Sequence, residues 1–403
     1  MTVQQPEFDA RVFVKLQIDE IAQRLGGERA IIAISGGVDS TTCASLAYKA
    51  MGKNLLCVFI DTGFMRLGEP RRVKALLSKR PLALPIRIVG AQERFIEAIG
   101  RNEDAEEKRK AFRETFYRTL SDIAKNEGCR FLIQGTIAPD WIETKGGIKT
   151  QHNVLEQIGI KAQERYGFTV IEPIANLYKD QVRVVARYLG IPREISERQP
   201  FPGPGLLVRC VGRVEQGKLK ALKRSTQIVE KHLATTGGQQ FFAVVLDNTV
   251  EDHPAKEPLQ KQVSESLKIR SREVKVNILQ NKATGVRGDS RVYGRIASVS
   301  ISKKHREVYG WLIEKLKELQ SRLTSTSTDL TRILYTIREG KESAPYDVAI
   351  RAIETRDFMT ADIVGIPWAT LTAAAKEILK KCSNVAHVHY DLTSKPPATI
   401  EFE

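Results

Sequence analysis

Short apolar runs rich in β-branched residues alternate with amphipathic stretches through the first half of the chain. The runs predict four strands, at Arg29–Ile34, Asn54–Ile60, Pro85–Val89 and Arg130–Gln134. Between them, apolar side chains at helical spacing predict helices over Ser40–Met51, Glu69–Lys79 and Asp104–Lys125. Strands that alternate with helices in this way generally pair in parallel. This half therefore predicts an α/β domain whose parallel sheet carries helices on both faces.

Polar and glycine-rich segments gather where these predicted strands end. Ser35–Ser40, Asp61–Gly63 and Gly135–Asp140 follow the first, second and fourth strands. Ligands of open parallel sheets bind beyond the carboxyl ends of the strands. These three segments are therefore the candidate binding segments of the first domain.

A cluster of prolines and glycines interrupts the alternation. Gln199–Gly205 holds three prolines and two glycines in seven residues. Such a segment cannot continue a helix or a central strand. We therefore predict one domain over residues 1–200 and a second, α+β domain over residues 201–403.

The second half carries a weak internal repeat with a period of about 50–55 residues. Its two copies cover about residues 283–340 and about residues 345–403, and each predicts a strand, a helix and a strand. The predicted elements are Tyr293–Ile301, Glu307–Leu323 and Arg332–Ile337, then Tyr346–Ile353, Pro367–Lys381 and Ala386–Asp391. Chance similarity between two amphipathic units is the alternative.

Composition excludes two broad classes of protein. Hydrophobic residues make up 42% of the 403 residues and the mean hydropathy is −0.27, so the chain can build packed cores and is not a disordered protein. No apolar run approaches the roughly 18 residues of a membrane span. The first residues lack the basic and apolar regions of a signal peptide. We expect a cytoplasmic protein.

Cysteines and net charge narrow the function only slightly. The five cysteines form no Cys-x-x-Cys pair, which argues against a zinc ribbon, a cysteine-ligated cluster or a disulfide scaffold. The formal net charge of +15 calls for an anionic partner. Nucleotides and phosphates meet that requirement as well as nucleic acid does.

The segment Ile34-Ser-Gly-Gly-Val-Asp-Ser40 is the strongest local signal. A strand leads into a Gly-Gly turn that opens a helix, and this geometry brings main-chain N–H groups and the helix dipole close to an anion. It is not a P-loop, because the Gly-Lys-Ser/Thr ending is absent. We expect the loop to bind phosphate groups, with Ser35 and Ser40 adding hydroxyl donors and Asp39 able to hold a metal that bridges phosphates.

The string Ser-Gly-Gly-Val-Asp-Ser resembles the PP-loop of the ATP pyrophosphatases. These enzymes split ATP into AMP and pyrophosphate while they adenylate a substrate. GMP synthetases, NAD synthetases, argininosuccinate and asparagine synthetases and several tRNA-modifying enzymes share the loop. The loop alone does not choose among them.

Five further segments resemble the ATP-pyrophosphatase part of the GMP synthetase family: Val58–Arg66, Glu106–Lys110, Gln134–Glu143, Arg198–Leu206 and the C-terminal Tyr390–Glu403. The C-terminal segment is the most telling match. The resemblance runs from about Glu28 to Glu403 and is weakest between about Gln216 and Lys282. It implies an adenine nucleotide alpha hydrolase-like sheet domain and a C-terminal dimerisation domain.

In that family the 2-oxo group of xanthosine monophosphate (XMP) attacks the α-phosphate of ATP, and ammonia then displaces AMP to give GMP. The resemblance implies that Mg²⁺ is held by Asp39 and Asp140, and that Val58 and Gly135 line the adenosine side. The residues that it implies for the ATP phosphates are Ser35, Gly36, Gly37, Val38, Asp39, Ser40 and Thr41. It implies catalytic roles for the polar residues Asp39, Asp140, Glu143, Lys149 and His152. The residues implied to bind XMP are Arg109, Asp289, Lys395, Thr399, Ile400 and Glu401.

The segment Ile148–Asn153 resembles the mobile lid of the family, with two departures. Gln151 stands where the family has the first of two histidines, and Val154–Gly159 replaces the common Gly-Gly-Leu-Pro. An acid–base or phosphate role for position 151 is therefore in doubt. Lys149 remains the best candidate to neutralise charge on the phosphate.

The resemblance also implies partners. No glutaminase domain precedes the loop in this sequence, so we expect ammonia to come from a separate glutamine amidotransferase subunit. The extra repeat unit resembles family members with a tandem dimerisation domain, which leaves a homodimer possible. No membrane partner is expected, and nucleic acid is not the expected partner.

Two alternatives stay open. Another PP-loop enzyme, such as a tRNA thiolase, would suit the net charge, but such enzymes commonly need paired cysteines and this sequence has none. A catalytically inactive nucleotide- or RNA-binding relative would keep the fold without the reaction. Asp39 and Lys149 argue against that second alternative.

Overall fold

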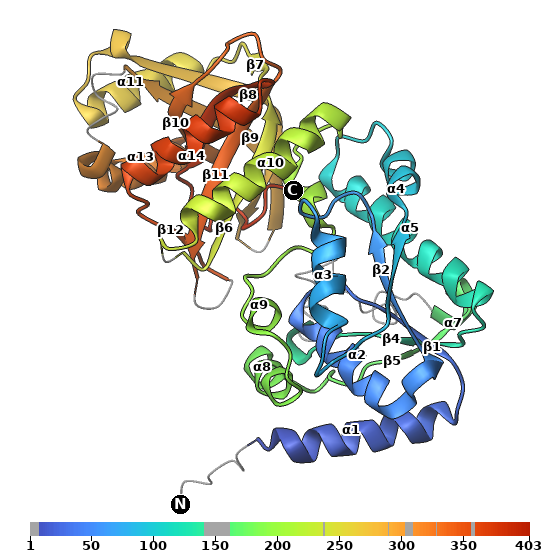
Figure 1. Cartoon of the computed structure of the whole chain (residues 1–403). Helices are drawn as coiled ribbons and strands as arrows, with labels where there is room; N and C mark the ends of the chain where they lie inside the picture. The colour runs from blue at the N-terminus through green and yellow to red at the C-terminus, as the bar shows by residue number, and fades with distance from the viewer. Residues whose placement is uncertain are drawn as a thin grey trace, which may run out of the picture. The chain divides into compact units, whose positions relative to one another are not determined.

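A computed structural model of the chain describes residues 8–140, 162–236, 238–288, 290–302, 309–327, 329–355 and 359–403 (Figure 1). The chain forms two compact units. The first comprises Met1–Ala98 and Ala111–Gly203, and the second comprises Ile99–Lys110 and Pro204–Glu403. The helix α5 (Ala105–Asn126) is therefore divided, and its residues 105–110 belong to the second unit.

The first unit is built on a five-stranded, fully parallel sheet in the order β3-β2-β1-β4-β5. Its strands are β1 (Ala30–Ala33), β2 (Leu55–Asp61), β3 (Ile86–Gly90), β4 (Phe131–Ile133) and β5 (Thr169–Ile171). The order reverses between β1 and β4, because the chain leaves β3 and returns on the other side of β1. This reversal is the switch point at which ligands of such sheets bind.

Helices cover both faces of this sheet (Figure 1). They are α1 (Ala10–Leu25), α2 (Val38–Met51), α3 (Glu69–Leu77), α4 (Gln92–Ile99), α5 (Ala105–Asn126), α7 (Ala162–Tyr166), α8 (Lys179–Tyr188) and α9 (Arg193–Ser196). Ala30 and Ile32 of β1 pack with the apolar sides of α1, α2, α3 and α8. Ile31 between them is equally buried but lies outside that cluster, as expected for side chains that alternate across a strand. Aromatic rings of α4 and α5 pack together, with Phe95 and Phe112 centred 4.9 Å apart.

The second unit contains an eight-stranded mixed sheet with the path β12-β11-β13-β10-β9-β8-β7, and β6 also pairs with β11. The strands are β6 (Gln240–Asp247), β7 (Val250–Glu251), β8 (Val274–Arg287), β9 (Ser290–Ile301), β10 (Leu330–Glu339), β11 (Tyr346–Glu354), β12 (Asp362–Ile363) and β13 (Val385–Asp391). Its helices are α10 (Gln216–Leu233), α11 (Lys256–Leu267), α13 (Tyr309–Thr326) and α14 (Trp368–Lys381). Short 3-10 turns cover Gly52–Asn54, Gly205–Arg209 and Ser271–Glu273.

The same strand–helix–strand connection occurs twice in this sheet. β9 and β10 are parallel and joined through α13, and β11 and β13 are parallel and joined through α14. β10 and β13 then pair antiparallel and bring the two strand–helix–strand units together. These units fall on the two segments in which the sequence shows its weak repeat.

One face of this sheet carries the C-terminal tail, residues 392–403, which follows β13. Phe402 packs in a buried cluster with Val244 of β6, Leu334 of β10 and Ala349 of β11. Side chains two positions along a strand share a face. Arg351 and Asp347 therefore lie on the same face as Ala349, on opposite sides of it along β11.

The predicted fold class is confirmed: a parallel sheet with helices on both faces is followed by a mixed-sheet unit. Each of the four predicted strands of the first half overlaps an observed strand, and the predicted ends lie within two residues of the observed ends. Within the described residues, no helix combines the length and apolar character that a membrane crossing requires.

Candidate nucleotide sites

The predicted phosphate loop lies at the switch point, between the end of β1 and the start of α2. Gly36 has a φ of +81°, and a Cβ there would lie 2.7 Å from Cγ2 of Val73. Both facts require glycine. Gly37 is the N-cap of α2 and has no side chain to accept from the first N–H groups of the helix. Those N–H groups are the ones that bind anions at a helix start.

Hydroxyl groups hold the loop in this shape. The hydroxyl oxygens of Ser35 and Ser40 lie 3.0 Å apart, and Ser40 Oγ accepts from the main-chain N–H of Ser35 at 3.2 Å. Thr41 donates its hydroxyl to the carbonyl of Gly37 at 2.8 Å. The side chain of Val38 is apolar and buried, so this residue can offer an anion only its main-chain N–H. The loop is thus shaped before any ligand arrives.

Gly135, at the end of β4, lies directly against this loop. A Cβ on Gly135 would lie 3.0 Å from the carbonyl carbon of Asp39 and from the nitrogen of Ser40. Close backbone approach therefore explains why a glycine follows β4. It also places the ends of β1 and β4, predicted separately, at one point.

Val58 lies within β2, opposite Ala33, the last residue of β1. Its carbonyl accepts from the N–H of Ile34 at 2.8 Å, and its side chain is fully buried. Asp61 ends the strand, where its carboxylate accepts from Gly63 N–H at 3.0 Å and from the Gln92 amide at 2.7 Å. Val58 thus borders the loop from within the sheet.

Asp39, the predicted metal ligand, contacts an ammonium group that the sequence did not predict. Lys179, the first residue of α8, lies 2.8 and 2.6 Å from its two carboxylate oxygens. The side chains keep 27% and 43% of their surface exposed, so the pair is solvated. The start of α2 therefore combines main-chain donors with a lysine ammonium. This arrangement suits the negative charge of a polyphosphate.

Asp140 closes the turn that follows Gly135. Its carboxylate accepts from the N–H of Ile137 at 3.0 Å. The N–H of Ala138 in the same turn donates to the carbonyl of Leu177, which joins this turn to the segment before α8. The predicted catalytic residue Glu143 and the predicted lid residues Lys149, Gln151 and His152 lie outside the described residues.

The proline–glycine segment after α9 is fixed to the first unit by two arginines. The guanidinium of Arg66 lies 4.0 Å from the ring centre of Phe201. Arg198 forms a two-pronged ion pair with Glu69 at the start of α3. The segment up to Gly203 is therefore rigidly placed near the end of β2.

In the second unit, three buried arginines hold the C-terminal tail. Arg209 pairs with both carboxylate oxygens of Glu401, at 2.8 and 2.7 Å. Arg332 and Arg351 share the buried carboxylate of Asp391, at 3.0 and 2.6 Å. Burial, and next the positive charge of Arg351, lower the pKa of Arg332 to about 9.

Three of the four predicted XMP residues of the tail, Thr399, Ile400 and Glu401, contact these arginines. The Thr399 hydroxyl lies 3.1 Å from Arg332, and the carbonyls of Thr399 and Ile400 accept from Arg351 at 3.0 and 2.9 Å. Lys395 forms a two-way main-chain bridge with Ala361. The side chain of Glu401 keeps 22% of its surface exposed, and each of its oxygens retains a lone pair beyond its bond to arginine.

Glu403, at the end of the described tail, is buried. The carboxylate of the Glu403 side chain pairs with Lys108 and accepts from Gly212 N–H at 2.8 Å. Burial raises the pKa of this carboxyl group, and Lys108 opposes that shift. The tail is therefore a fixed part of the unit and not a frayed end.

Arg109, another predicted XMP residue, lies in the same unit beside a second cation. It donates to Glu106 at 3.0 Å and is 9% exposed. Burial, and next the charge of Arg109, lower the pKa of Arg291 on β9. Val286, at the end of β8, donates to the carbonyl of Pro397 at 2.7 Å, so the β8–β9 hairpin borders the tail. Asp289, also predicted to bind XMP, lies outside the described residues.

Sequence reasoning missed several residues of these sites. Arg332 directly precedes the apolar run Ile333–Tyr335, and Arg351 stands between Ile350 and Ala352, and a charge beside such apolar residues is a signal that could have revealed them. Lys179 has no such signal, because it meets Asp39 across 140 residues. Arg291 lies two residues beyond Asp289 in the sequence, and the prediction for Asp289 could have drawn attention to it.

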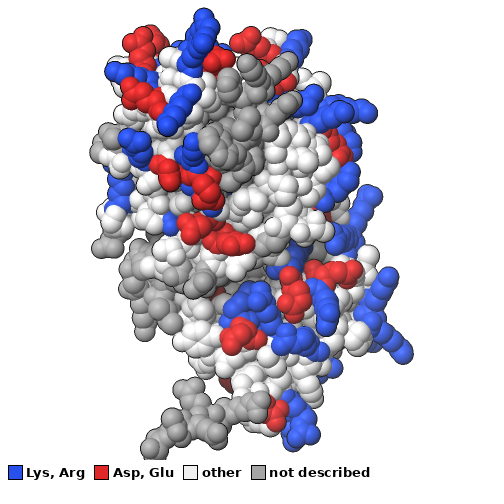
Figure 2. All heavy atoms as spheres, turned by 90° about the vertical axis from the view of Figure 1, so that its left-hand side faces the viewer, with Lys and Arg blue, Asp and Glu red and all other residues white. Residues whose placement is uncertain are grey.

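Charge is mixed on the face of the molecule drawn in Figure 2. Lys and Arg side chains are numerous there, and Asp and Glu side chains lie among them. This face therefore does not carry a continuous basic surface of the kind that tracks a nucleic acid backbone.

A parallel sheet with an anion-binding turn at its switch point defines a nucleotide-binding α/β protein with a PP-loop. Comparison with known proteins narrows the class. The family model of the GMP synthase C terminal domain matches residues 337–402. The chain is 45% identical over 396 residues to a subunit of the glutamine-hydrolyzing GMP synthase of Sulfurisphaera tokodaii, and the match covers 98% of this chain and 100% of that protein. The homologues of Saccharolobus solfataricus and Methanopyrus kandleri are 46% and 39% identical, again over 98% of this chain and 100% of each protein. The chain belongs to the family of this GMP synthase subunit, which confirms the resemblance seen in the sequence.

Among solved structures, NMN synthetase from Francisella tularensis is 19% identical and covers 49% of this chain and 78% of its own, with a TM-score of 0.38. NAD⁺ synthetase from Burkholderia pseudomallei is also 19% identical and covers 50% of this chain and 75% of its own, with a TM-score of 0.37.

Proposed function

We propose that the chain is a ligase that converts XMP to GMP at the expense of ATP, which leaves as AMP and pyrophosphate. The 2-oxo oxygen of XMP forms a bond to the α-phosphorus, and the bond to pyrophosphate breaks. Ammonia then forms a bond to C2 of the purine, AMP departs with the former 2-oxo oxygen, and the nitrogen loses a proton. Membership of the GMP synthase family supports this reaction.

The observation that carries the proposal is the phosphate loop at the switch point. The free N–H groups at the start of α2 and the ammonium of Lys179 face the same region as Asp39. These groups would hold the β- and γ-phosphates and stabilise the charge that accumulates on departing pyrophosphate. The loop is braced by Ser35 and Ser40, so little reorganisation is needed on binding.

We propose Mg²⁺ as the metal that accompanies ATP. The carboxylate of Asp39 is partly exposed and already binds a cation, Lys179, and carboxylate oxygen is the ligand that Mg²⁺ prefers. Asp39 and Asp140 would hold the ion, which neutralises phosphate charge when bound. The N–H groups of the loop orient the leaving group independently of it.

XMP would be bound in the second unit. Arg109 and Arg291 bring two cations together, and a 5′-phosphate would relieve their mutual repulsion. The tail would supply Lys395 and the remaining lone pairs of Glu401 for the purine. Because Arg209 holds Glu401 by two bonds, its carboxylate would meet the nucleotide in a fixed orientation.

The test is a pyrophosphate-release assay with ATP, Mg²⁺ and ammonia. XMP should be required, while IMP, AMP and GMP at the same concentration should give the rate without acceptor. Equal release with any of these acceptors would refute the substrate assignment. Salt-sensitive RNA binding without XMP-dependent release would favour a tRNA-modifying enzyme or an inactive relative instead.

We further propose a separate glutamine amidotransferase subunit as the source of ammonia. The relatives are each named as one subunit of a glutamine-hydrolyzing enzyme, which supports this partner. A mixture of the two subunits should form GMP with glutamine in place of ammonia. We also propose a cytoplasmic location, where ATP and purine nucleotides are made. The tandem strand–helix–strand units are the surface that a homodimer would use, and analytical ultracentrifugation of the chain alone tests this.

A further inference from the structure

The sheet of the second unit has a cavity on its tail-bearing face that the proposed reaction does not use. Its volume is about 280 Å³. The tail covers Ala349 and Arg351 on this face, and the cavity begins at Asp347, farther along β11. Two histidines of β13, His387 and His389, line the same cavity.

These three residues form a compact donor set. One donor atom each of Asp347, His387 and His389 lies within 4.8 Å of the others, and among the described residues this is the one such group of three. His387 and His389 are two positions apart on β13, so both rings lie on one face. The parallel pairing of β11 with β13 brings Asp347 beside them.

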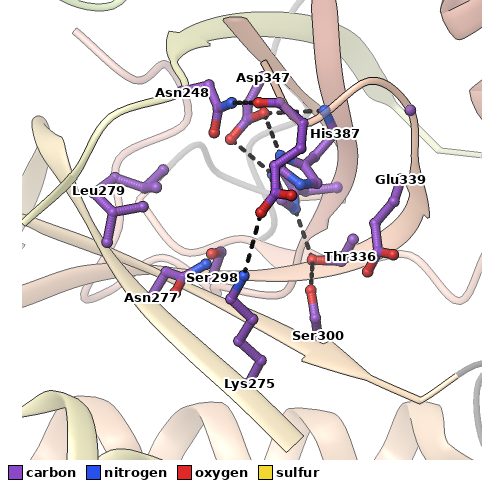
Figure 3. A pocket seen from close by; sticks show the side chains of 14 residues that line it. Asn248, Lys275, Asn277, Leu279, Ser298, Ser300, Thr336, Glu339, Asp347 and His387 are labelled. Atoms are coloured by element: carbon purple, nitrogen blue, oxygen red, sulfur yellow. Dashed lines mark hydrogen bonds and ion pairs between the residues drawn. The ribbon is translucent and has the colours of Figure 1, made fainter. Parts of the chain in front are cut away.

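The carboxylate of Asp347 is flanked by one imidazole on each side. Its Oδ1 lies 2.8 Å from Nδ1 of His387, and its Oδ2 lies 3.4 Å from Nε2 of His389. The main-chain N–H of His387 also donates to Oδ1 at 3.0 Å, which fixes the carboxylate. Figure 3 shows Asp347 and His387 side by side at one end of the cavity.

His389 is held so that Nε2 is the atom presented to Asp347. Its Nδ1 lies 3.1 Å from the hydroxyl of Thr336, which accepts from Ser300 at 2.6 Å. Its Nε2 is buried and has no hydrogen-bond partner among the described residues, and the side chain is 3% exposed. A metal-binding histidine usually donates its second ring N–H to an oxygen acceptor that fixes the ring, and the hydroxyl oxygen of Thr336 can accept in this way.

We propose that Asp347, His387 and His389 bind a divalent transition-metal ion of the zinc class. Two imidazoles and one carboxylate are the ligands of open zinc sites. Bonds of the usual length to a tetrahedral zinc ion would separate neighbouring ligand atoms by about 3.3 Å. The two imidazoles lie near this distance from the carboxylate but from different oxygens, His389 Nε2 at 3.4 Å from Oδ2 and His387 Nδ1 at 2.8 Å from Oδ1. Because the three donor atoms already lie within 4.8 Å of one another, small side-chain rotations would bring them around one ion.

The cavity gives this ion an open position. Three protein ligands leave a fourth site, and the cavity has room for several waters at about 30 Å³ each. Its walls carry polar groups, among them Asn277, Ser298 and Lys275, which Figure 3 places across the cavity from Asp347. A water molecule or a small anionic ligand can therefore complete the coordination. This proposal does not depend on the proposed reaction.

The test measures Zn²⁺ and Co²⁺ binding to the full chain after chelator treatment, in excess Mg²⁺. We expect one equivalent of Zn²⁺ with submicromolar affinity, a rise of Tm on its addition, and visible Co²⁺ bands of a nitrogen–oxygen site. His387→Ala and Asp347→Asn should each weaken binding at least about 100-fold, and Thr336→Val about 10-fold. His387 is half-buried and Asn matches the shape of Asp, so both variants should fold, which circular dichroism checks.

His232→Ala is the matched control, because His232 also faces a carboxylate, Glu377, at 2.7 Å but has no second imidazole there. It should bind Zn²⁺ as the parent chain does. A parent chain that retains no Zn²⁺ overturns the proposal without any variant. So do a thiolate spectrum with Co²⁺, which would point to one of the five cysteines, and unchanged binding in His387→Ala.

Discussion

Replacing Gly135 by alanine tests whether the junction of β4 with the phosphate loop governs catalysis. The added methyl carbon would lie 3.0 Å from Asp39 C and Ser40 N, where ordinary contact begins at about 3.4 Å. The partners are backbone atoms and cannot rotate away. The first turn of α2 must therefore move by about 0.4 Å, which costs about 1–3 kcal/mol of stability as a typical overpacking substitution.

This displacement acts on the N–H groups proposed to hold pyrophosphate. Misplacement by 1 Å can lower a rate about 100-fold, so a shift of 0.4 Å should lower kcat by about tenfold. XMP-dependent pyrophosphate release at 25 °C, with ATP varied, measures kcat and the KM for ATP. Thermal unfolding followed by circular dichroism measures the accompanying loss of Tm.

Gly90→Ala provides the matched control. Gly90 ends β3 of the same sheet, and a Cβ there meets nothing within 4 Å. Its kcat, KM for ATP and Tm should equal those of the parent chain. A Gly135→Ala chain with parental kcat and KM for ATP would show that this junction does not position the phosphates.

Three further substitutions address charge. Asp39→Ala removes an exposed pair with Lys179, so the free energy of unfolding should change by less than about 1 kcal/mol while pyrophosphate release falls at least about 100-fold; retained release would exclude a metal role. Lys395→Ala should raise the KM for XMP at least about tenfold and leave that for ATP unchanged, with exposed Lys220→Ala as control; equal effects on both substrates would contradict the assignment. Hydrogen bonds from Lys381, His232 and Lys231 lower the pKa of Glu377 from 4.5 to about 2. Folding thus favours its ionised form, so Glu377→Gln should lower the urea midpoint at pH 7, and the difference should shrink as pH falls from about 5 toward 2; a difference independent of pH would exclude the carboxylate charge as its cause.

Much of the first unit could be predicted from the sequence because its signals are local. The apolar runs and the glycines of the phosphate loop act through neighbouring residues, and the strand ends they marked do meet at one point. The helices α1 and α8, by contrast, were not predicted. Their partly apolar sides become evident only beside α2, against which both pack.

Contacts between distant residues could not be predicted in the same way. Lys179 reaches Asp39 only because α8 packs near α2, and the sequence between them gives no spacing rule. The zinc-class site is an intermediate case. His387 and His389 have the two-residue spacing of one strand face, which the sequence shows. The third ligand, Asp347, lies 40 residues away and follows only from the pairing of β11 with β13.

Buried charge explains why the tail motif is so specific. Arg332 and Arg351 are fully buried, and an uncompensated buried ion costs about 3–5 kcal/mol. Asp391 pairs with both arginines but supplies one negative charge for two, and the carbonyls of Thr399 and Ile400 satisfy further N–H donors of Arg351. The sheet is therefore incompletely satisfied until the tail has docked. It follows that Lys395 and Glu401 would meet a nucleotide from a segment already ordered by folding, so little conformational entropy remains to be lost on binding.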